Sequence, residues 1–417
     1  MNILVIGGGG REHAICWALR KSPRVTKIYC APGNGGIAAV AECVNIAAAD
    51  LGGMVKFARE NPVDFVMIAP DDPLALGMAD AMEAAGIRAF GPRKNAAILE
   101  SSKIFSKNLM KKYGIPTAAY EVFTELERAL AYIREKGAPI VVKADGLALG
   151  KGVVVAKTAD EAAAAVREMM EDKKFGASGA RVVIEECMTG PEVTVLAFTD
   201  GKTVVPMLSS QDHKRAFDND EGPNTGGMGA ICPSPHYTPE LAAQCMETIF
   251  RPTAEAMNRE GRPFKGVLYF GLMITPDGPR VVEYNARFGD PEAQAALPLL
   301  KTDLLDIFEA VADERLGELE IEWLPGASCC VVMASGGYPG GYETGKSITG
   351  LDDVPEDITV FHAGTRLENG EIVTNGGRVL GVTAAADSPA AARARAYEGV
   401  ARVSFEKAHY RTDIGRI

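Results

Sequence analysis

The first ninety residues alternate between short apolar runs and longer segments of mixed polarity. The apolar runs are NILVIG, KIYCAPG, DFVMIAP and IRAFGP, and each ends at glycine or proline. The segments between them, at 11–22, 51–61 and 73–86, have apolar residues at helical spacing and predict one helix each. This alternation is typical of a parallel sheet with helical crossovers. Functional groups in such a sheet gather at the carboxyl ends of the strands.

The middle of the chain follows a different pattern. Helical periodicity extends from about Asn95 to Tyr113, which predicts one long amphipathic helix. Residues 120–188 mix helices and strands and predict a small α+β unit. Two strands are predicted over 192–208. The polar, glycine-rich residues 209–230 predict a long loop, because they contain little that could form a core.

The remainder returns to regular elements. A helix is predicted over 238–260, followed by a β-hairpin that turns at Asp277-Gly278 and by two shorter helices. The residues Leu-Pro-Gly at 324–326 predict a boundary, and strands with a final helix near 389–405 lie beyond it. At 417 residues the chain is too long for one domain. We predict an α/β and α+β multidomain protein with domains at 1–101, 102–325 (including a subdomain at about 120–188) and 326–417.

Composition excludes several classes of function. A net charge of −11 argues against non-specific nucleic-acid binding, which needs an excess of Lys and Arg. No apolar run approaches the roughly 20 residues of a membrane helix. We expect no signal peptide and no fused downstream enzyme. The eight cysteines are scattered without a CxxC pair, which is typical of a reduced, cytoplasmic protein. We expect small-molecule partners, no nucleic-acid or membrane partner, and a monomer or weak homodimer.

The opening motif is IGGGGREHA. A dinucleotide-binding fingerprint requires GxGxxG, but the third position falls on Glu12, and the second strand ends without an acidic residue for a ribose. A phosphate site remains open, since the first turn of a helix offers free N–H groups and a positive dipole end. Arg11 and His13 favour an anion there, whereas the alternative is a structural tight turn.

The segment KADGLALGKGVVV predicts a strand, a glycine loop and a second strand. Its glycines allow backbone N–H groups to approach phosphate oxygens, and Lys143 and Lys151 supply positive charge. It does not match the Walker A pattern. A plain hairpin turn is the alternative.

The segment VVEYNARFGDPE predicts a strand with a polar face. Because alternate residues of a strand share a face, Glu283, Asn285 and Arg287 are expected to point the same way. A carboxylate and an amide oxygen suit a hard cation such as Mg²⁺, which usually shares nucleotide phosphates with the protein. Arg287 would neutralise charge on a phosphoryl oxygen. The alternative is a solvated strand face.

The segments SQDHKR and GPNTGGMG combine charge with glycine. Asp212 is suited to bind an amine, and the basic residues 213–215 are suited to bind carboxylate or phosphate. A solvated charged loop is the alternative. His362 and His409 stand alone in the sequence, and we interpret both as structural.

Together these motifs resemble the ATP-grasp superfamily and, within it, the phosphoribosylamine–glycine ligase family. The resemblance covers the whole chain, with IGGGGREHA, APGN, LESSK, KADGLALGKGV, IEE, RFGDPE, MASGGYPG and FHAGT in order. SQDHKR and GPNTGGMGA are particular to this family. The resemblance implies an N-terminal pre-ATP-grasp domain, an ATP-grasp domain with a lid at about 120–188, and a C-terminal mixed α/β domain.

The resemblance also implies the reaction. Glycine would be joined to 5-phosphoribosylamine at the expense of ATP, with Mg²⁺ or Mn²⁺, in purine biosynthesis. The glycine carboxylate would attack the γ-phosphate to form glycyl phosphate, from which the ribosylamine nitrogen would displace phosphate. Catalysis of this kind needs mostly positioning and charge neutralisation.

The roles implied by the resemblance fall into four groups. The catalytic residues would be Lys143, Asp212 and Arg287. ATP would bind Lys103, Lys143, Gly146, Gly150, Lys151, Gly152, Glu185, Glu186, Cys187 and Glu192, with residues 185–187 presenting backbone to adenine. The two substrates would contact Gly9, Gly10, Arg11, Asn34, Pro70, Asp71, Asp212, Lys214, Gly226, Gly227, Arg287 and Asp290, with the opening loop at the substrate phosphate. The metal would bind Glu283 and Asn285.

Three alternatives differ in what they require. Other ATP-grasp ligases or carboxylases acting on a phosphorylated substrate would lack SQDHKR and GPNTGGMG. A nicotinamide dehydrogenase needs the missing third glycine and ribose acid. A silent nucleotide-binding module predicts decay at Glu283, Asn285 or Arg287. The chain departs from the family at Asp71, where Glu is usual, at Gly8 and Leu149, and in lacking a carboxylate on the strand before Glu283.

Overall fold

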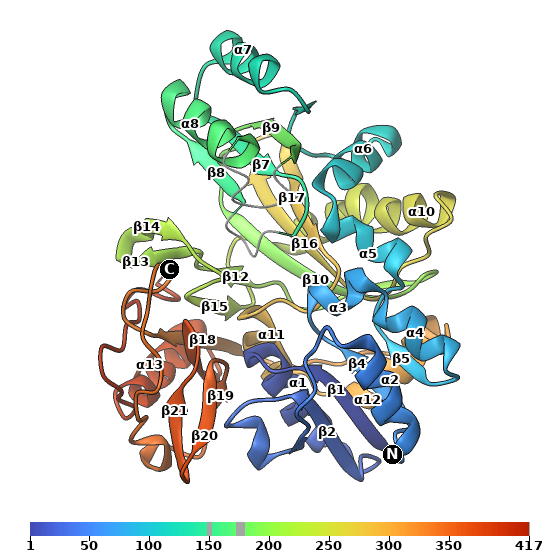
Figure 1. Cartoon of the computed structure of the whole chain (residues 1–417), viewed down its shortest axis with the longest axis vertical. Coiled ribbons are helices and arrows are strands. Elements are labelled where there is room, and N and C mark those ends of the chain that lie inside the picture. The colour runs from blue at the N-terminus through green and yellow to red at the C-terminus, as the bar shows by residue number, and fades with distance from the viewer. Residues whose placement is uncertain (148–151, 172–179, 417) are drawn as a thin grey trace.

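The computed structural model describes residues 1–147, 152–171 and 180–416. It has three regions in chain order, and the central one rises above the other two in Figure 1. The three-domain α/β and α+β architecture and the N-terminal parallel sheet predicted from the sequence are confirmed.

The N-terminal region is a five-stranded parallel sheet of order β3-β2-β1-β4-β5. Its strands are β1 (Asn2–Gly7), β2 (Lys27–Pro32), β3 (Glu42–Cys43), β4 (Phe65–Ile68) and β5 (Arg88–Phe90). Its helices are α1 (Gly10–Arg20), α2 (Leu51–Glu60), α3 (Asp71–Leu76) and α4 (Met78–Ala84). The exposed strand β3 is too short to give a sequence signal and was not predicted.

Two predicted helices are each broken in two. The helix predicted over 73–86 breaks at Gly77, whose φ of +100° is a left-handed conformation that favours glycine. The helix predicted over 95–113 divides into α5 (Lys94–Ser101) and α6 (Lys103–Tyr113). Ser102 lies in an extended conformation between them, and its hydroxyl caps α6 by accepting from the N–H of Phe105.

The central region contains two antiparallel sheets. The order of the upper sheet is β6-β9-β7-β8, and that of the lower sheet is β11-β10-β16-β17. The upper strands are β6 (Tyr120–Phe123), β7 (Ile140–Ala144), β8 (Val153–Ala156) and β9 (Val182–Glu186), with helices α7 (Leu126–Lys136) and α8 (Ala159–Met170). The lower strands are β10 (Glu192–Asp200), β11 (Val204–Pro206), β16 (Lys265–Thr275) and β17 (Gly278–Asn285). The helix predicted over 238–260 is α9 (Pro239–Cys245), a π-helical turn (Met246–Phe250) and α10 (Arg251–Arg259).

The prediction of a long loop over 209–230 is wrong, because the structure has short strands there. They are β12 (Gln211–Asp212), β13 (Arg215–Phe217), β14 (Glu221–Asn224) and β15 (Gly229–Cys232). Strands β12 and β15 extend the C-terminal sheet, whose order is β12-β15-β18-β22-β19. Strand β18 of the C-terminal region provides hydrogen-bonding partners for β15, which explains why this polar segment forms strands.

The C-terminal region follows two short helices, α11 (Glu292–Ala296) and α12 (Leu304–Ala312). Its remaining elements are β18 (Ala327–Ala334), β19 (Ile358–His362), β20 (Thr365–Glu368), β21 (Glu371–Thr374), β22 (Arg378–Ala386) and α13 (Pro389–Val400). Helix α13 packs on β18 and β22.

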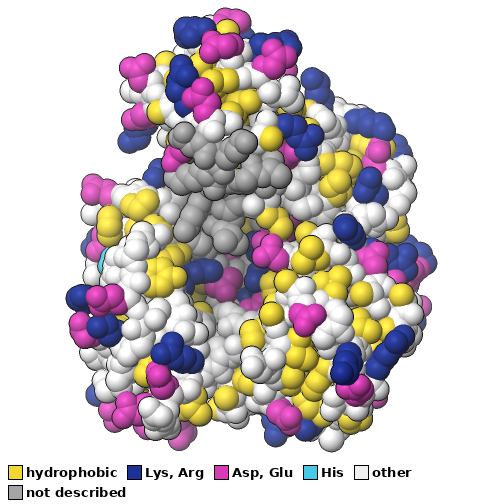
Figure 2. Space-filling model, viewed as in Figure 1, with side chains coloured by type: hydrophobic (Ala, Val, Ile, Leu, Met, Phe, Trp, Pro, Cys, Tyr) yellow, Lys and Arg dark blue, Asp and Glu magenta, His cyan; other side chains and the backbone are white. Residues whose placement is uncertain are grey.

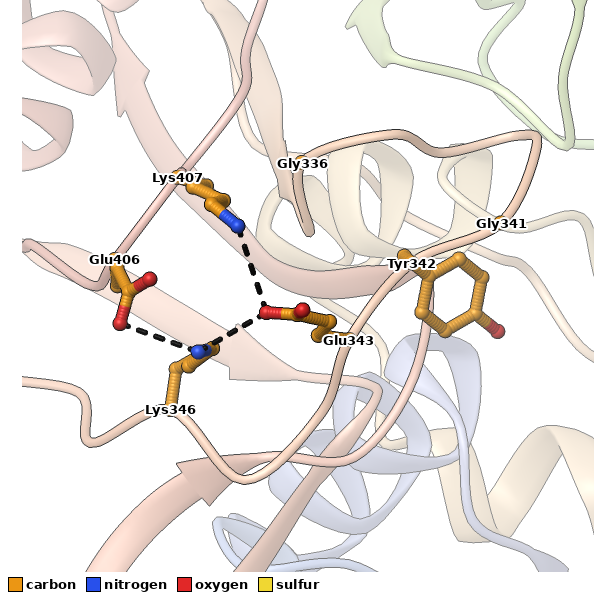
Figure 3. Close-up of a pocket in the computed structure, with 7 residues that line it drawn as sticks. All are labelled: Gly336, Gly341, Tyr342, Glu343, Lys346, Glu406 and Lys407. Atoms are coloured by element: carbon orange, nitrogen blue, oxygen red, sulfur yellow. Dashed lines mark ion pairs between the residues drawn. The ribbon is translucent and has the colours of Figure 1, made fainter.

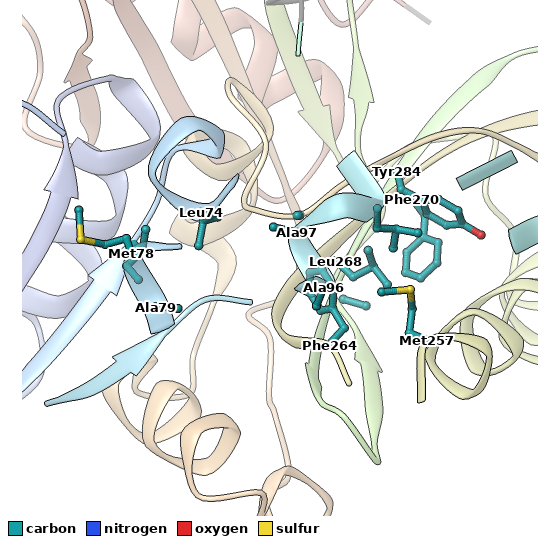
Figure 4. Packing of buried hydrophobic residues seen from close by; sticks show 14 of the residues in the cluster. Leu74, Met78, Ala79, Ala96, Ala97, Met257, Phe264, Leu268, Phe270 and Tyr284 are labelled. Atoms are coloured by element: carbon teal, nitrogen blue, oxygen red, sulfur yellow. The ribbon is translucent and has the colours of Figure 1, made fainter. Parts of the chain in front are cut away.

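One apolar core joins the N-terminal and central regions. Figure 4 shows it passing from Met78 of α4 through Ala97 of α5 to Phe270 of β16, and each side chain is buried. Burial of this kind contributes roughly 25 cal/mol for each Å² of apolar surface removed from water. The two regions are therefore packed as one body, and the polar groups between them are held at fixed distances.

Candidate active site

Strand β17 brings the predicted metal residues together. Glu283 lies opposite Gly271 of β16, and Asn285 lies opposite Tyr269, on the same face as Glu283. Burial alone would raise the pKa of Glu283, but the nearby lysines outweigh it and lower that pKa to about 2. One of them, Lys214, holds its Nζ 3.6 Å from Glu283 Oε1. The carboxylate is therefore ionised.

The pair of Glu283 and Asn285 suits an ion that shares nucleotide phosphates. It offers one carboxylate and one amide oxygen, the donors that Mg²⁺ prefers. Among the described residues no group of three His, Cys, Asp or Glu side chains could hold a metal by itself. An ion held here would thus complete its coordination with phosphate and water oxygens.

Arg287 follows at the end of β17 and is held by Glu100, Asn285 and the carbonyl of Phe288. Its Nη2 lies 3.0 Å from Glu100 Oε1 and donates to Asn285 Oδ1 at 3.2 Å. Glu100 in turn accepts the backbone N–H of Ala286 at 2.8 Å. The Nε of Arg287 is buried and makes no hydrogen bond with any described residue. A buried, unpartnered donor beside two metal-type ligands suits an anionic ligand.

Three buried charged groups meet under the upper sheet. Glu185 Oε2 lies 3.0 Å from Nζ of Lys143 and 2.9 Å from Nζ of Lys107. Burial lowers the pKa of Lys107 to about 8 against the opposing effect of Glu185. Glu185 Oε1 is buried without a partner among the described residues. Lys107 was not predicted, since it lies on α6 and resembles any other lysine of an amphipathic helix.

Lys103, Gly146 and Gly152, which were also predicted to bind the nucleotide, have protein partners. Lys103, at the start of α6, donates from Nζ to the carbonyl of Gly146 at 2.9 Å. The carbonyl of Gly152 accepts the N–H of Ala144 at 2.9 Å. Gly150 and Lys151 lie outside the described residues, as does Leu149.

The segment 185–187 leaves β9 toward the lower sheet. The backbone of Glu185 pairs with both β6 and β7. The N–H of Glu186 donates to the carbonyl of Ala119, and its carboxylate lies 3.0 Å from Nη1 of Arg280. Cys187 is half-buried with a free thiol. Glu192 begins β10, with Oε2 3.9 Å from Nζ of Lys214.

The SQDHKR segment, which spans β12 and the start of β13, directs its side chains to two sides. We call the charged groups around Glu283, Arg287 and Glu185 the centre. Asp212 and Lys214 face it, and Asp212 Oδ1 is buried without a partner among the described residues. Burial, and then the carboxylate of Glu292, raise the pKa of Asp212. His213 turns away to the carbonyl of Gly229, and Arg215 donates to the carbonyl of Gly222. The prediction that the basic residues 213–215 act together on an anion is therefore wrong, because only Lys214 of the three lies in the centre.

Gly227 allows the GPNTGG loop to approach the centre. Its φ of +115° favours glycine, and a Cβ there would lie 2.6 Å from Asp212 Oδ1. Arg378 of β22 donates from Nη1 to the carbonyls of Gly226 at 2.8 Å and Asp290 at 2.6 Å. It also lies 3.2 Å from Asp290 Oδ1. Arg378 was not predicted, and it joins the C-terminal region to two loops of the site.

A cavity of about 480 Å³ adjoins this arginine between the N-terminal and C-terminal regions. The opening glycine loop, Asn34, Pro70 and Asp290 line one side. The C-terminal region lines the other with residues 363–365, Asn375 and Arg378. Figure 2 shows charged side chains of both signs gathered in a hollow on this face.

Two backbone donors of the opening loop that were expected to bind phosphate are already hydrogen-bonded within the protein. The N–H of Gly9 donates to Glu12 Oε2 at 2.6 Å, and the N–H of Arg11 donates to Asp290 Oδ2 at 3.0 Å. The Arg11 side chain donates to Glu12 and to the carbonyl of Phe288. Gly10 packs against Gln294. Two carboxylates thus cap the first turn of α1.

Asn34 and Asp71 also have protein partners. The Asn34 amide donates to the carbonyls of Gly8 and His362, and its Oδ1 accepts the N–H groups of Gly36 and Ile37. Asp71 accepts the N–H of Asp72 at 3.1 Å, and its negative charge helps to raise the pKa of Arg287.

His13 and His362 form a buried contact between the terminal regions. The N–H of His362 donates to Nδ1 of His13 at 2.8 Å. Burial, reinforced by His362, lowers the pKa of His13 to about 3, and burial lowers that of His362 to about 4. His409 bonds the carbonyl of Ala216. His13 thus has a structural contact with the C-terminal region, and His362 and His409 have the structural contacts that were predicted.

A second hollow of about 340 Å³ lies within the C-terminal region and shares no lining residue with the first. Figure 3 shows that its charged side chains face one another. Lys346 Nζ lies 3.1 Å from Glu343 and 3.2 Å from Glu406, and Lys407 lies 3.5 Å from Glu343. These charges compensate each other, in contrast to the unpartnered groups of the centre.

No helix in the described part of the chain is both long and apolar enough to cross a membrane.

Family models of phosphoribosylglycinamide synthetase match all three regions. The N domain matches residues 1–100, the ATP-grasp (A) domain matches 101–293, and the C domain matches 328–417.

Known proteins similar to the chain agree with these models. Phosphoribosylamine–glycine ligase of Halalkalibacterium halodurans is 51% identical over 100% of this chain and 96% of its own length. The same-named protein of Vibrio parahaemolyticus is 50% identical over 100% of this chain and 98% of its own. A crystal structure of phosphoribosylamine–glycine ligase from Thermotoga maritima has a TM-score of 0.88 at 33% identity, covering 99% of this chain and 100% of that one.

A more distant neighbour shares the fold alone. It is the biotin carboxylase domain of Hydrogenobacter thermophilus 2-oxoglutarate carboxylase, with a TM-score of 0.75 at 17% identity, covering 98% of this chain and 91% of that one. Three matching domains in order, relatives at about half identity and a shared full-length structure lead to one conclusion. The chain is an ATP-dependent ligase that belongs to the phosphoribosylglycinamide synthetase (phosphoribosylamine–glycine ligase) family of ATP-grasp enzymes.

Proposed function

We propose that the protein joins glycine to 5-phosphoribosylamine, with cleavage of ATP to ADP and phosphate, in purine biosynthesis. One observation carries the proposal beyond family membership. The centre contains an acceptor and a donor, Asp212 Oδ1 and Arg287 Nε, that are buried without a partner in the described part of the chain, beside the Glu283–Asn285 pair. Next to it lies a cavity of about 480 Å³, large enough for a phosphorylated sugar. An amine, a carboxylate and a nucleotide therefore each have complementary groups within one site.

The nucleotide would lie between the two central sheets. Lys103 and Lys143 present ammonium groups to its phosphates, and Lys143 is positioned by Glu185 at 3.0 Å. The free oxygen Glu185 Oε1 is suited to accept from the adenine amino group. Glu283 and Asn285 would hold Mg²⁺ or Mn²⁺, which when bound would neutralise charge on the phosphate oxygens.

The chemistry then divides into two displacements. In the first, a glycine carboxylate oxygen attacks the γ-phosphorus, the bond to the ADP oxygen breaks, and glycyl phosphate forms. In the second, the ribosylamine nitrogen attacks the glycyl carbonyl carbon, and phosphate leaves with one glycine oxygen. Arg287 is placed to stabilise negative charge at the carboxyl–phosphoryl junction, since its Nε is buried and its guanidinium is always charged.

Asp212 would bind the glycine amine. Its burial beside Glu292 raises its pKa, and the approach of an ammonium group would reverse that shift by favouring the carboxylate. Lys214, on the same side of β12, balances the charge of Glu283 and Glu192. All eight cysteines are free, which supports a reducing compartment, and we place the reaction in the cytoplasm.

The test is phosphate release from ATP and Mg²⁺ with glycine and freshly prepared phosphoribosylamine, added singly and together. Turnover only with both supports the proposed ligase, and stimulation by another acid–amine pair instead contradicts the assigned substrates. Glycine labelled with ¹⁸O in its carboxylate adds a test of the intermediate. One labelled oxygen per turnover is expected in the released phosphate, and unlabelled phosphate would exclude glycyl phosphate.

A further inference from the structure

The 480 Å³ cavity has two walls with different hydrogen-bonding capacity. On the N-terminal wall, the N–H groups of Gly9 and Arg11 donate to Glu12 and Asp290. The Asn34 amide there is also fully hydrogen-bonded. A phosphate placed on the first turn of α1 would displace or face two carboxylates. This wall is therefore suited to hydroxyl groups, which can donate to Glu12 and Asp290.

The C-terminal wall retains free donors. Arg378 makes all its hydrogen bonds through Nη1, and its Nε and Nη2 have no partner among the described residues. Its side chain is 22% exposed and lines the cavity. Asn375 accepts from Arg366 through Oδ1, while its Nδ2 has no hydrogen bond within the described chain. The backbone brings the two residues together, because Gly364 bonds both the N–H of Asn375 and the carbonyl of Arg378.

We propose that the phosphate of the phosphorylated substrate binds the C-terminal wall, on the Nε–Nη2 edge of Arg378 with Asn375 beside it, and not the glycine loop. Two parallel N–H groups of a guanidinium match two oxygens of a phosphate. The same arginine holds the carbonyls of Gly226 and Asp290 through Nη1, so it also positions the loops that face the reacting amine. This inference rests on the proposed function, which supplies a phosphorylated substrate.

The experiment compares the product, glycinamide ribonucleotide, with its dephosphorylated riboside. Both are titrated calorimetrically into wild type, Arg378→Gln, Asn375→Ala and Arg395→Gln. Arg395 is a matched control on α13, where it pairs with Asp357 and Glu398 away from the cavity. We expect Arg378→Gln to raise the Kd for the ribonucleotide by about tenfold or more and the Kd for the riboside by less than about threefold. Asn375→Ala should lower the preference for the ribonucleotide over the riboside by a smaller factor, and Arg395→Gln should leave this preference unchanged.

Each other result identifies a different failure. Equal weakening of both ligands would mean that Arg378 acts only by holding the loops, and an undiminished preference in Arg378→Gln would place the phosphate elsewhere; either overturns this inference alone. A wild-type protein that does not prefer the ribonucleotide would overturn the proposed substrate as well. If Arg378→Gln does not fold, Asn375→Ala decides, because the Asn375 side chain is hydrogen-bonded to Arg366 and to neither of the two loops in the described structure.

Discussion

The opening glycine loop and the charged centre are both rich in polar groups, but they differ in how those groups are partnered. In the loop, two of the N–H groups predicted to bind phosphate are bonded within the protein, that of Gly9 to Glu12 and that of Arg11 to Asp290. In the centre, buried atoms of Asp212, Glu185 and Arg287 have no partner among the described residues. Buried polar atoms are rarely left unbonded.

This difference distinguishes polar groups that stabilise the fold from polar groups that remain available to bind a ligand. Glycines at the end of a strand permit a tight turn whether or not a ligand follows, so their number says little about phosphate. Unpartnered buried atoms are costly to leave in a fold, and a site that retains them is suited to a ligand that satisfies them. Changes in the centre should therefore affect turnover, whereas changes in the loop should affect stability.

The largest effect is expected in the centre, from Glu283→Gln. The substitution removes the carboxylate that would hold the metal and leaves Lys214 and its neighbouring cations without their counter-charge. We expect kcat for ATP-dependent ligation to fall by about 10³-fold, while the melting temperature changes little. Phosphate release and calorimetric unfolding measure the two quantities.

Glu343→Gln is the matched control for this variant. Glu343 is an exposed carboxylate that also pairs with two lysines, but it lies in the second hollow (Figure 3). Its turnover should equal that of wild type. Near-normal turnover of Glu283→Gln would remove the metal assignment, and a large loss of stability would show that the centre is structural.

The next effect is expected in the loop, from Asn34→Ala. Asn34 bonds two carbonyls and two N–H groups, and one of the carbonyls belongs to His362 in the C-terminal region. We expect a loss of about 2–3 kcal/mol of stability, measured by denaturant unfolding, because partners are left unpaired. The value of kcat at saturating substrate should stay within about threefold. A large rise in KM for the ribosylamine without loss of stability would instead make Asn34 a direct substrate contact.

Local pattern predicted most elements of the fold, but not its breaks or its bridging strands. The N-terminal strands were predictable because each is a continuous apolar run between turn residues. The break at Ser102 was not, since helical periodicity continues across it while its hydroxyl caps the second helix. Strand β15 gains its partner from β18, nearly a hundred residues later, and β12 pairs in turn with β15, so no local pattern indicates these strands.

The same limit applies to the site. Glu283, Asn285 and Arg287 were expected to share a face because of their spacing, and strand β17 provides that arrangement for the first two. Lys107 and Arg378 could not be found in this way. Arg378 bonds Gly226 across 152 residues of sequence, and Lys107 becomes distinctive only through its buried contact with Glu185.

Lys107→Met tests whether the unpredicted lysine belongs to the centre in function as well as in position. Its removal leaves Glu185 with Lys143 alone, which changes the charge beside the proposed nucleotide site. We expect KM for ATP to rise about tenfold, with a smaller change in kcat and none in KM for glycine. Lys111→Met, an exposed position on the same helix, is the control and should match wild type. Equal changes for all substrates would indicate a general structural effect.

The smallest effect concerns the joint beneath the loop, where His13 and His362 meet. Both have pKa values well below 6.5, about 3 and about 4, because burial disfavours their charged forms. In the unfolded chain both bind protons near pH 6.5. Their contribution to stability is therefore complete above pH 6.5 and is lost as the pH falls toward 4 and 3, by about 1.4 kcal/mol per pH unit for each histidine.

His13→Asn removes one of these titrations and retains an acceptor for the N–H of His362, since Asn Oδ1 occupies nearly the place of His Nδ1. The stability measured between pH 6 and 4.5 should fall about half as steeply as in wild type, and exposed His236→Asn should not change the slope. An unchanged slope in His13→Asn would mean that other groups control acid unfolding. A reduced slope with normal turnover at pH 8 would establish that His13 joins the opening helix to the C-terminal region and does not bind an anion in turnover.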